Sequence, residues 1–164
     1  MLTLYLLRHA KSSWEEASQQ DFERPLTNRG RKACALIGEF IEEKGIDFDL
    51  VLVSTAVRTR QTIELIKEQA KLRGEVRYDE RIYEATVSQL LEVIAQVDSD
   101  RENVLLVGHN PGIEGLLALL TGQQQRVTTA NFAKIKITAT KWSGSLANKG
   151  TLEWIVRPKE IPEN

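Results

Sequence analysis

Three short, almost uninterrupted apolar runs stand out along the chain, at residues 2–7 (LTLYLL), 49–55 (DLVLVST) and 103–108 (NVLLVG). Runs of this length are typical of strands buried on both faces of a parallel sheet. Elsewhere apolar residues recur every three or four positions, which predicts helices over 26–45, 58–74, 88–97 and 111–122. Strands that alternate with helices favour an α/β domain with a mainly parallel sheet.

Residues that commonly begin and end helices support these boundaries. Thr27 or Asn28 can cap the first helix, and Gly45 follows its last turn. Gly74 is predicted to close the second helix, and Ser88 is a candidate cap for the third. Pro111 can open the fourth helix. The segment 76–85 is predicted to be a short strand followed by a loop.

The pattern changes after Gly122. Residues 132–138 (FAKIKIT) and 151–156 (TLEWIV) alternate apolar and polar positions, and the turn-rich segment 142–150 joins them. This pattern predicts a hairpin at the sheet edge. The length of 164 residues fits one domain, and no repeat or linker divides it. We therefore expect a single three-layer domain over residues 1–164, with a C-terminal edge hairpin.

Composition excludes several function classes. Lys and Arg total 22 and Asp and Glu total 23, so net charge gives no reason to expect nucleic acid or a membrane as partner. The first apolar run meets Arg8 too early for a signal peptide, and no stretch approaches a membrane span. Cys34 is the only cysteine, so neither an intrachain disulfide nor a cysteine metal cluster is expected. These features predict a cytoplasmic protein.

Both histidines of the chain directly follow apolar runs. In an α/β sheet, ligand sites form beyond the carboxyl ends of the strands, so residues just past different strands converge there. The residues in such positions are Arg8, His9, Ser54, Thr55, Arg58, Arg60, Gly108, His109 and Asn110. Two imidazoles and at least two guanidinium groups are therefore expected in one crevice.

This combination of side chains points to phosphate. A single histidine after a strand is more often an ordinary loop residue, and a single arginine is usually a solvated charge. Several cations in one crevice repel each other unless an anion joins them, and the arginine fork suits phosphate oxygens. The chain has neither a Walker loop nor a dinucleotide fingerprint. Two histidines without a matched carboxylate pattern make a poor metal site, so neither a metal nor a cofactor is expected.

Four sequence blocks resemble one known signature. They are LRHAKSSW (7–14), RPLTNRG (24–30), VSTAVRTRQT (53–62) and LLVGHNPG (105–112). In this order and at these spacings they resemble the histidine phosphatase superfamily, the phosphoglycerate-mutase-like enzymes, and above all its small SixA-like phosphohistidine phosphatases. The resemblance extends to 128–137 and 152–159, so it spans nearly the whole chain and implies a phosphoglycerate-mutase-like fold.

The resemblance implies a role for each site residue. His9 would be the nucleophile whose ring nitrogen attacks phosphorus, giving a phosphohistidine that water then hydrolyses. Arg8, Arg58 and His109 would hold the phosphoryl oxygens and offset charge in the transition state. Ser12 is a further candidate for a phosphate hydrogen bond, although its hydroxyl could equally cap a turn.

The chain also departs from the larger members of this family. They have glycine where this chain has Ala10, and many have a phosphate-binding asparagine where it has Glu15, so that contact is expected to be missing. Their general acid is a glutamate in a segment resembling 79–85 (DERIYEA), which makes Glu80 and Glu84 the two candidates. A phosphohistidine substrate needs such an acid less than an alkyl phosphate does, because its nitrogen leaving group is good.

Three functions are considered. The leading hypothesis is a phosphatase acting on phosphohistidine in a protein, because the chain has little room for the insertions that roof the site in larger members. The alternatives are a small-molecule phosphomonoesterase, whose partner would be a small phosphate ester, and a non-catalytic phosphate-binding module. The intact set of Arg8, His9, Arg58 and His109 argues against the last. Mutase activity is not expected without a roof over the site.

Overall fold

Strands and helices alternate along most of the chain, as the apolar pattern predicts. The structure, a computed structural model, describes residues 1–13 and 20–162. Its elements are β1 (Leu2–Arg8), α1 (Asn28–Lys44), β2 (Leu50–Val53), α2 (Val57–Gln69), β3 (Glu75–Tyr78), α3 (Val87–Ala95), β4 (Asn103–Gly108), α4 (Gly112–Thr121), β5 (Phe132–Ile137) and β6 (Gly150–Val156). Three short 3₁₀ turns complete them: η1 (Asp21–Glu23), η2 (Glu80–Ile82) and η3 (Pro158–Glu160). The predicted α/β class is confirmed.

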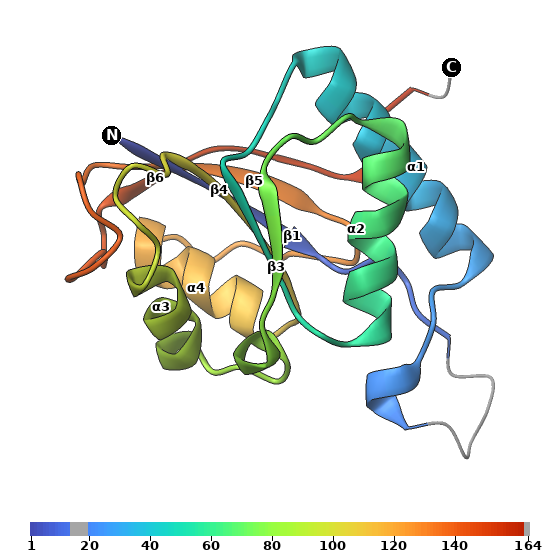
Figure 1. Cartoon of the computed structure of the whole chain (residues 1–164), viewed down its shortest axis with the longest axis horizontal. Coiled ribbons are helices and arrows are strands. Elements are labelled where there is room, and N and C mark those ends of the chain that lie inside the picture. Colours follow the sequence, from blue (N-terminus) through green and yellow to red (C-terminus); the bar gives the residue numbers. More distant parts are fainter. Residues whose placement is uncertain (14–19, 163–164) are drawn as a thin grey trace.

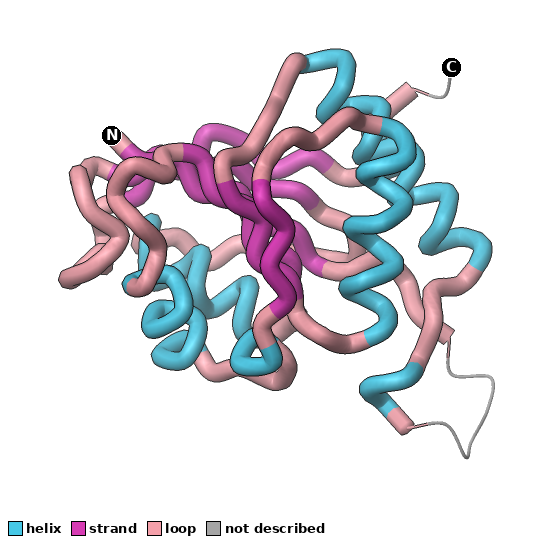
Figure 2. Tube along the Cα trace, viewed as in Figure 1, coloured by secondary structure: helices cyan, strands magenta, loops and turns pink. Residues whose placement is uncertain are grey.

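The strands form a mixed sheet in the order β3-β2-β4-β1-β5-β6. Strands β3, β2, β4 and β1 run parallel, whereas β5 pairs antiparallel with both β1 and β6. The predicted hairpin at the sheet edge is therefore confirmed, with β6 outermost. In Figure 2 the strands form one twisted band between two groups of helices.

Helices cover both faces of this sheet, which gives three layers. α1 and α2 pack together on one face, and α3 and α4 on the other (Figure 1). The uninterrupted apolar run of β1 follows from this arrangement. Leu4 and Leu6 belong to the apolar core on the α3 and α4 side, whereas Tyr5 and Leu7 belong to the core beneath α1 and α2. Since both faces are buried, both sets of side chains must be apolar.

The caps of α1 agree with prediction. The Thr27 hydroxyl accepts a hydrogen bond from the Gly30 amide, and Gly45 ends the helix in the left-handed region at φ 65°. Gly122 likewise ends α4 in the left-handed region, at φ 75°.

Two predicted helix ends were wrong. α2 ends at Gln69, five residues before Gly74, because the next residues find other partners for their backbone amides. The amide of Lys71 donates to the Glu42 carboxylate and that of Arg73 to the Asp47 carboxylate. α3 is capped by Thr86 rather than Ser88. Thr86 forms a reciprocal capping box with Gln89, which satisfies two amides at once.

No helix in the part of the chain that the structure describes is long and apolar enough to cross a membrane.

A close backbone contact fixes the loop after β1. We call residues 9–13 the His9 loop. Its Lys11 carbonyl accepts from both the Thr27 amide (2.9 Å) and the Thr27 hydroxyl (3.2 Å). A Cβ atom on Gly30 would lie only 2.3 Å from the Lys11 carbonyl oxygen. Only glycine therefore lets the first turn of α1 approach the loop this closely.

We expect Gly30→Ala to destabilise the protein by about 1–3 kcal/mol, because the added methyl must displace backbone rather than a side-chain tip. Urea denaturation measures this change. Gly115→Ala is a matched control inside a helix, since its Cβ would meet only a methyl group of Val87. Equal stability losses in the two variants would contradict this account.

Candidate active site

Strand register brings the two histidines together. Arg8, the last residue of β1, pairs with Gly108, the last residue of β4, so the residues that follow, His9 and His109, lie side by side. Their ring centroids are 5.2 Å apart, and both residues are buried. Val53 of β2 pairs with Val107 in the same way, which places Ser54 next to His109.

The His9 ring is held with its Nε2 atom unprotonated. Nδ1 lies 2.7 Å from the Ala10 carbonyl oxygen. A carbonyl only accepts hydrogen bonds, so Nδ1 carries the proton and Nε2 carries the lone pair. Burial above all, together with the charges of Arg58 and Arg8, lowers the pKa of His9 to about 4, although the hydrogen bond to the Ala10 carbonyl acts in the opposite direction. The ring is therefore neutral at physiological pH.

His109 is neutral for the same reason. Burial, followed by the charges of His9 and Arg58, lowers its pKa to about 3. Its Nε2 lies 2.7 Å from the Ser54 hydroxyl, and the Tyr83 ring packs edge-on against it at 5.5 Å between centroids. Its buried Nδ1 has no hydrogen-bond partner among the described residues.

Arg8 is anchored by a network that also holds the segment before β5. Its Nη1 donates to the Val127 carbonyl at 3.2 Å, and the side-chain amide of Asn110 donates to the same oxygen at 2.8 Å. The Glu114 carboxylate accepts from both the Asn110 side chain and the Val127 amide. Burial lowers the pKa of Arg8, and the charge of Glu114 opposes that shift.

Arg58 projects from the first turn of α2 and is 6% exposed. Its Nη1 donates to the Asp21 backbone carbonyl (2.7 Å) and its Nη2 to the Asp21 carboxylate (3.0 Å). The same carboxylate accepts from Arg24 at 2.8 Å and from the Tyr83 hydroxyl at 2.6 Å. Burial raises the pKa of Asp21, but these donors outweigh it and hold the pKa at about 2, so Asp21 is ionised.

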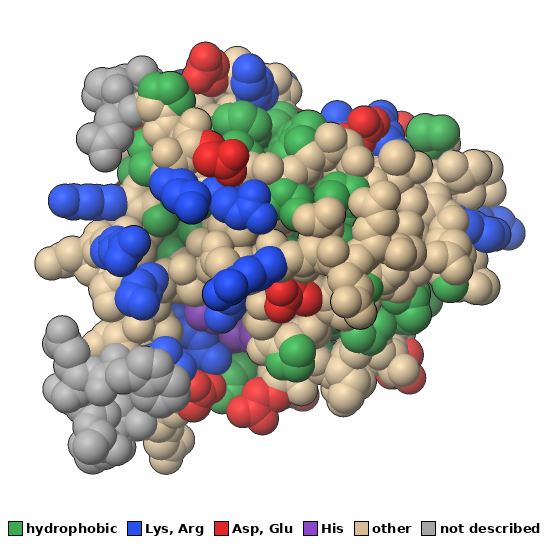
Figure 3. All heavy atoms as spheres, turned by 180° about the vertical axis from the view of Figure 1, so that it is seen from behind, with side chains coloured by type: hydrophobic (Ala, Val, Ile, Leu, Met, Phe, Trp, Pro, Cys, Tyr) green, Lys and Arg blue, Asp and Glu red, His purple; other side chains and the backbone are tan. Residues whose placement is uncertain are grey.

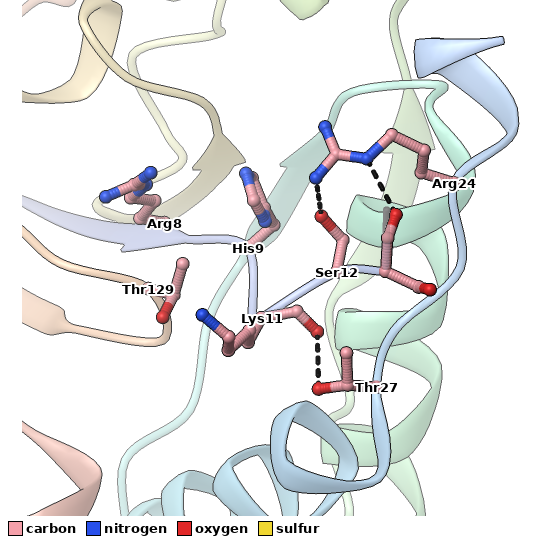
Figure 4. A pocket seen from close by; sticks show the side chains of 8 residues that line it. Arg8, His9, Lys11, Ser12, Arg24, Thr27 and Thr129 are labelled. Carbon is pink, nitrogen blue, oxygen red and sulfur yellow. Dashed lines mark hydrogen bonds between the residues drawn. The ribbon is translucent and has the colours of Figure 1, made fainter. Parts of the chain in front are cut away.

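A cavity of about 360 Å³ opens beside His9 (Figure 4). Its lining consists entirely of polar and cationic residues: Arg8, His9, Lys11, Ser12, Ser13, Arg24, Thr27 and Thr129. Arg24 donates to the Ser12 hydroxyl at 2.5 Å and to the Ser13 carbonyl at 2.9 Å. Figure 3 shows the histidines in a recess that Lys and Arg side chains border. The cavity suits an anionic ligand.

The structure thus brings Arg8, His9, Arg58 and His109 to one end of the sheet. Ser12 lines the cavity, with its hydroxyl engaged by Arg24. Arg8 and His9 line the cavity, whereas Arg58 and His109 do not. The candidate acids Glu80 and Glu84 are both exposed, and neither lines the cavity.

Two other residues named from the sequence do not join this group. Arg60 is exposed, with its guanidinium carbon 5.9 Å from the Tyr78 ring centroid, so it points away from the crevice. Glu15 lies outside the described residues.

Sequence reasoning missed Asp21, Arg24, Lys11 and Tyr83. Asp21 and Arg24 lie in or next to η1, well past the end of β1, and Tyr83 follows β3, whose residues are mostly exposed, so the rule based on buried apolar strands does not reach them. The resemblance offered signals for three of them, since Lys11 lies in the LRHAKSSW block, Arg24 begins the RPLTNRG block and Tyr83 lies in the segment 79–85. Across residues 1–13 and 20–162, no group of three or more His, Cys, Asp or Glu residues could hold a metal ion.

Comparisons with known proteins agree with this geometry. Residues 4–90 match the sequence profile of the histidine phosphatase superfamily (branch 1). An uncharacterized chloroplastic protein of Arabidopsis thaliana is 28% identical over 98% of this chain and 78% of its own length. An uncharacterized protein of Mycobacterium tuberculosis is 34% identical over 70% of this chain and 69% of its own length.

Solved structures include two SixA proteins, both named as candidate phosphohistidine phosphatases. The one from Nakamurella multipartitia is 29% identical, with a TM-score of 0.84 and coverage of 96% of both chains. The one from Agrobacterium tumefaciens is 27% identical, with a TM-score of 0.83 and coverage of 96% of this chain and 98% of that one.

The low pKa values lead to a direct prediction. The chain has two histidines, so an NMR titration shows two sets of imidazole signals. Since both folded pKa values lie near 3 to 4, neither ring should titrate between pH 8 and pH 5, where a free histidine (pKa about 6.5) changes charge. A midpoint near 6.5 for either ring would show that its nitrogen is not desolvated as described.

Proposed function

The chain belongs to the histidine phosphatase superfamily, and we propose that it is a phosphatase whose substrate is a phosphohistidine side chain of another protein. The observation that carries the proposal is the state of His9. Its Nε2 lone pair is free beside a cationic cavity, because Nδ1 donates to the Ala10 carbonyl. An imidazole nitrogen held in this way is a nucleophile at neutral pH.

The proposed reaction has two displacements. The His9 Nε2 lone pair attacks phosphorus, the bond from phosphorus to the substrate nitrogen breaks, and the substrate ring, which carries a proton on its other nitrogen, takes the electron pair and leaves as neutral imidazole. Water then attacks the phosphoryl group on His9, the bond from phosphorus to Nε2 breaks, and its electron pair returns to Nε2; both water protons leave with the product as dihydrogen phosphate, and His9 is again neutral. The covalent intermediate divides one difficult displacement into two easier ones.

Arg8, Arg58 and His109 are proposed to hold the phosphoryl oxygens in both steps. Each carries a buried nitrogen with no partner among the described residues: Nε of Arg8, Nε of Arg58 and Nδ1 of His109. The two arginine Nε atoms are buried donors without partners, which is costly and supports the binding of an oxyanion here. A phosphoryl dianion beside His109 would favour its protonated form, so the ring becomes a charged donor only when substrate binds.

The position of the candidate acids supports phosphohistidine over a phosphate ester. Glu80 and Glu84 are exposed, and among the described residues neither forms a hydrogen bond or ion pair with Arg8, His9, Arg58 or His109. An alkoxide leaving group needs a proton donor, whereas an imidazole is a far better leaving group. Similarity to the two SixA structures supports the same choice.

A small-molecule phosphomonoesterase remains the second candidate, because a polar cavity of about 360 Å³ has room for a small phosphate ester. A non-catalytic phosphate-binding module is disfavoured by the unprotonated Nε2 of His9, which binding alone does not require. We propose Ser12 as a minor contact, acting while it also accepts from Arg24.

His9→Ala is expected to abolish phosphatase activity, because no other group at the site can accept the phosphoryl group. His109→Ala should lower the rate about 10²–10³-fold, the usual effect of removing one donor to developing charge. Steady-state assays measure both losses. A phosphate label that is labile in acid and stable in base should appear on the wild type and on His109→Ala. The same label on His9→Ala would place the nucleophile elsewhere.

The substrate proposal predicts a preference among phosphorylated compounds. Phosphotransfer domains that carry phosphohistidine should lose phosphate faster than simple sugar phosphates do. The measurement is kcat/KM for each substrate at the same enzyme concentration. We propose that the reaction needs no metal, so rates should be the same with and without a chelator. Faster turnover of the sugar phosphates would favour the phosphomonoesterase, and loss of activity in chelator would refute the metal-free mechanism.

A further inference from the structure

Asp21 is an acidic residue at the centre of a network of four hydrogen bonds, two of which come from Arg58, a proposed phosphate-binding arginine. Its backbone carbonyl and carboxylate each accept from Arg58, and the carboxylate also accepts from Arg24 and from the Tyr83 hydroxyl. We propose that Asp21 is a positioning residue for phosphoryl transfer, which orients the Arg58 guanidinium for the transition state. The proposal rests on the phosphatase function proposed above.

Asp21 joins three separate parts of the chain at the site. It lies in η1, Arg58 belongs to α2, and Arg24 connects onward to the His9 loop. The Arg24 guanidinium donates to the Ser12 hydroxyl and to the Ser13 carbonyl, so a continuous chain of hydrogen bonds runs from the His9 loop through Asp21 to α2. The His9 loop and Arg58 therefore share one anchor.

The geometry leaves Arg58 able to bind an oxyanion while Asp21 holds it. A guanidinium has five N–H groups. Two of those on Arg58 are used by Asp21, one on each terminal nitrogen, and the buried Nε has no partner among the described residues. Asp21 thus fixes the plane of the fork and leaves donors for phosphate. A guanidinium fixed in advance need not reorganise when charge develops.

The charge balance favours the same role. Arg8, Arg24, Arg58 and Lys11 bring four positive charges, and Asp21 and Glu114 bring two negative ones, which leaves a net charge of +2 for these six residues. That value matches a phosphoryl dianion. Without Asp21, Arg24 and Arg58 would repel each other before substrate arrives, and their side chains would separate.

Aromatic packing holds η1 in this position. The Phe22 ring packs edge-on against Tyr83 at 5.2 Å between centroids, and the Arg58 guanidinium carbon lies 5.9 Å from the Tyr83 ring centroid. Tyr83 therefore supports both the residue after Asp21 and the arginine that Asp21 orients.

The test is a double-mutant cycle between Asp21→Asn and Arg58→Ala. Asp21→Asn keeps the size of the side chain and removes its charge. We expect kcat to fall about 10–100-fold with a smaller change in KM, because a misplaced donor affects the transition state most. In the Arg58→Ala background the same substitution should cost less than about 3-fold, since a residue that acts through Arg58 has nothing left to orient.

A binding measurement separates positioning from a merely structural role. Orthovanadate adopts the five-coordinate geometry of the transition state, whereas inorganic phosphate does not. Asp21→Asn should weaken vanadate inhibition by about 10-fold or more and phosphate inhibition by less than about 3-fold. Asp21→Glu should recover part of the vanadate affinity, because it restores the charge.

Glu75→Gln is the matched control. Glu75 also bridges two arginines, Arg77 and Arg101, and its side chain is 45% exposed against 38% for Asp21. It lies at the other end of the sheet, so its loss should leave kcat and vanadate inhibition unchanged. Thermal unfolding of all variants identifies losses that come from folding.

If Asp21→Asn does not fold, Tyr83→Phe serves in its place, because it removes one hydrogen-bond donor to Asp21. Tyr83→Phe should lower kcat up to about 10-fold when Arg58 is present and should have no such effect in the Arg58→Ala background.

Three outcomes would overturn the proposal. Tighter vanadate binding by Asp21→Asn would mean that Asp21 competes with phosphate for Arg58. Equal losses in both backgrounds would mean that it does not act through Arg58, and equal losses of vanadate and phosphate affinity would mean that it does not favour the transition state. A wild type that binds vanadate with this Asp21 dependence but leaves phosphohistidine intact would refute the proposed function alone.

Discussion

The parallel pairing of β1 with β4 is the constraint on which the site depends. Because Arg8 lies opposite Gly108, the next residues on the two strands, His9 and His109, must emerge side by side. A shift of one residue would turn every side chain of β1 to the opposite face, exchanging Leu4 and Leu6 with Tyr5 and Leu7 between the two cores. The packing of both cores therefore fixes the register, and the register fixes the distance between the imidazoles.

Electrostatics then determines what surrounds the histidines. Arginines that are mostly buried are tolerable only when they find partners, and each of the two that flank the imidazoles has an acidic residue close to it. The charge of Glu114 opposes the lowering of the Arg8 pKa by burial, and Glu114 is tied to Arg8 through Val127, whereas Asp21 binds Arg58 directly. These carboxylates offset part of the positive charge and leave the remainder for an anion. The histidines, which have no such partner, remain neutral.

The sequence allowed the histidines to be located but not the residues that support them. His9, His109 and Arg58 follow buried strands, and strand ends can be recognised from local apolar runs. Asp21 and Tyr83 lie in or beside 3₁₀ turns whose positions depend on contacts with distant residues, so no local pattern marks them. The wrong end of α2 has a similar origin. The Glu42 and Asp47 carboxylates bind the amides after Gln69, and a local propensity cannot register partners from a neighbouring segment.

Neutral imidazoles serve the proposed reaction in two different ways. His9 must be unprotonated to attack, and desolvation together with the nearby arginines secures this without any catalytic base. His109 must instead donate, which a ring with one proton can do from a single nitrogen. A phosphoryl dianion reverses the local field that suppresses its protonation, so the bound substrate itself would draw a second proton onto His109. The charges of the arginines would thus keep His9 unprotonated before substrate binds. Once a bound phosphoryl group neutralises those charges, His109 could become a cation.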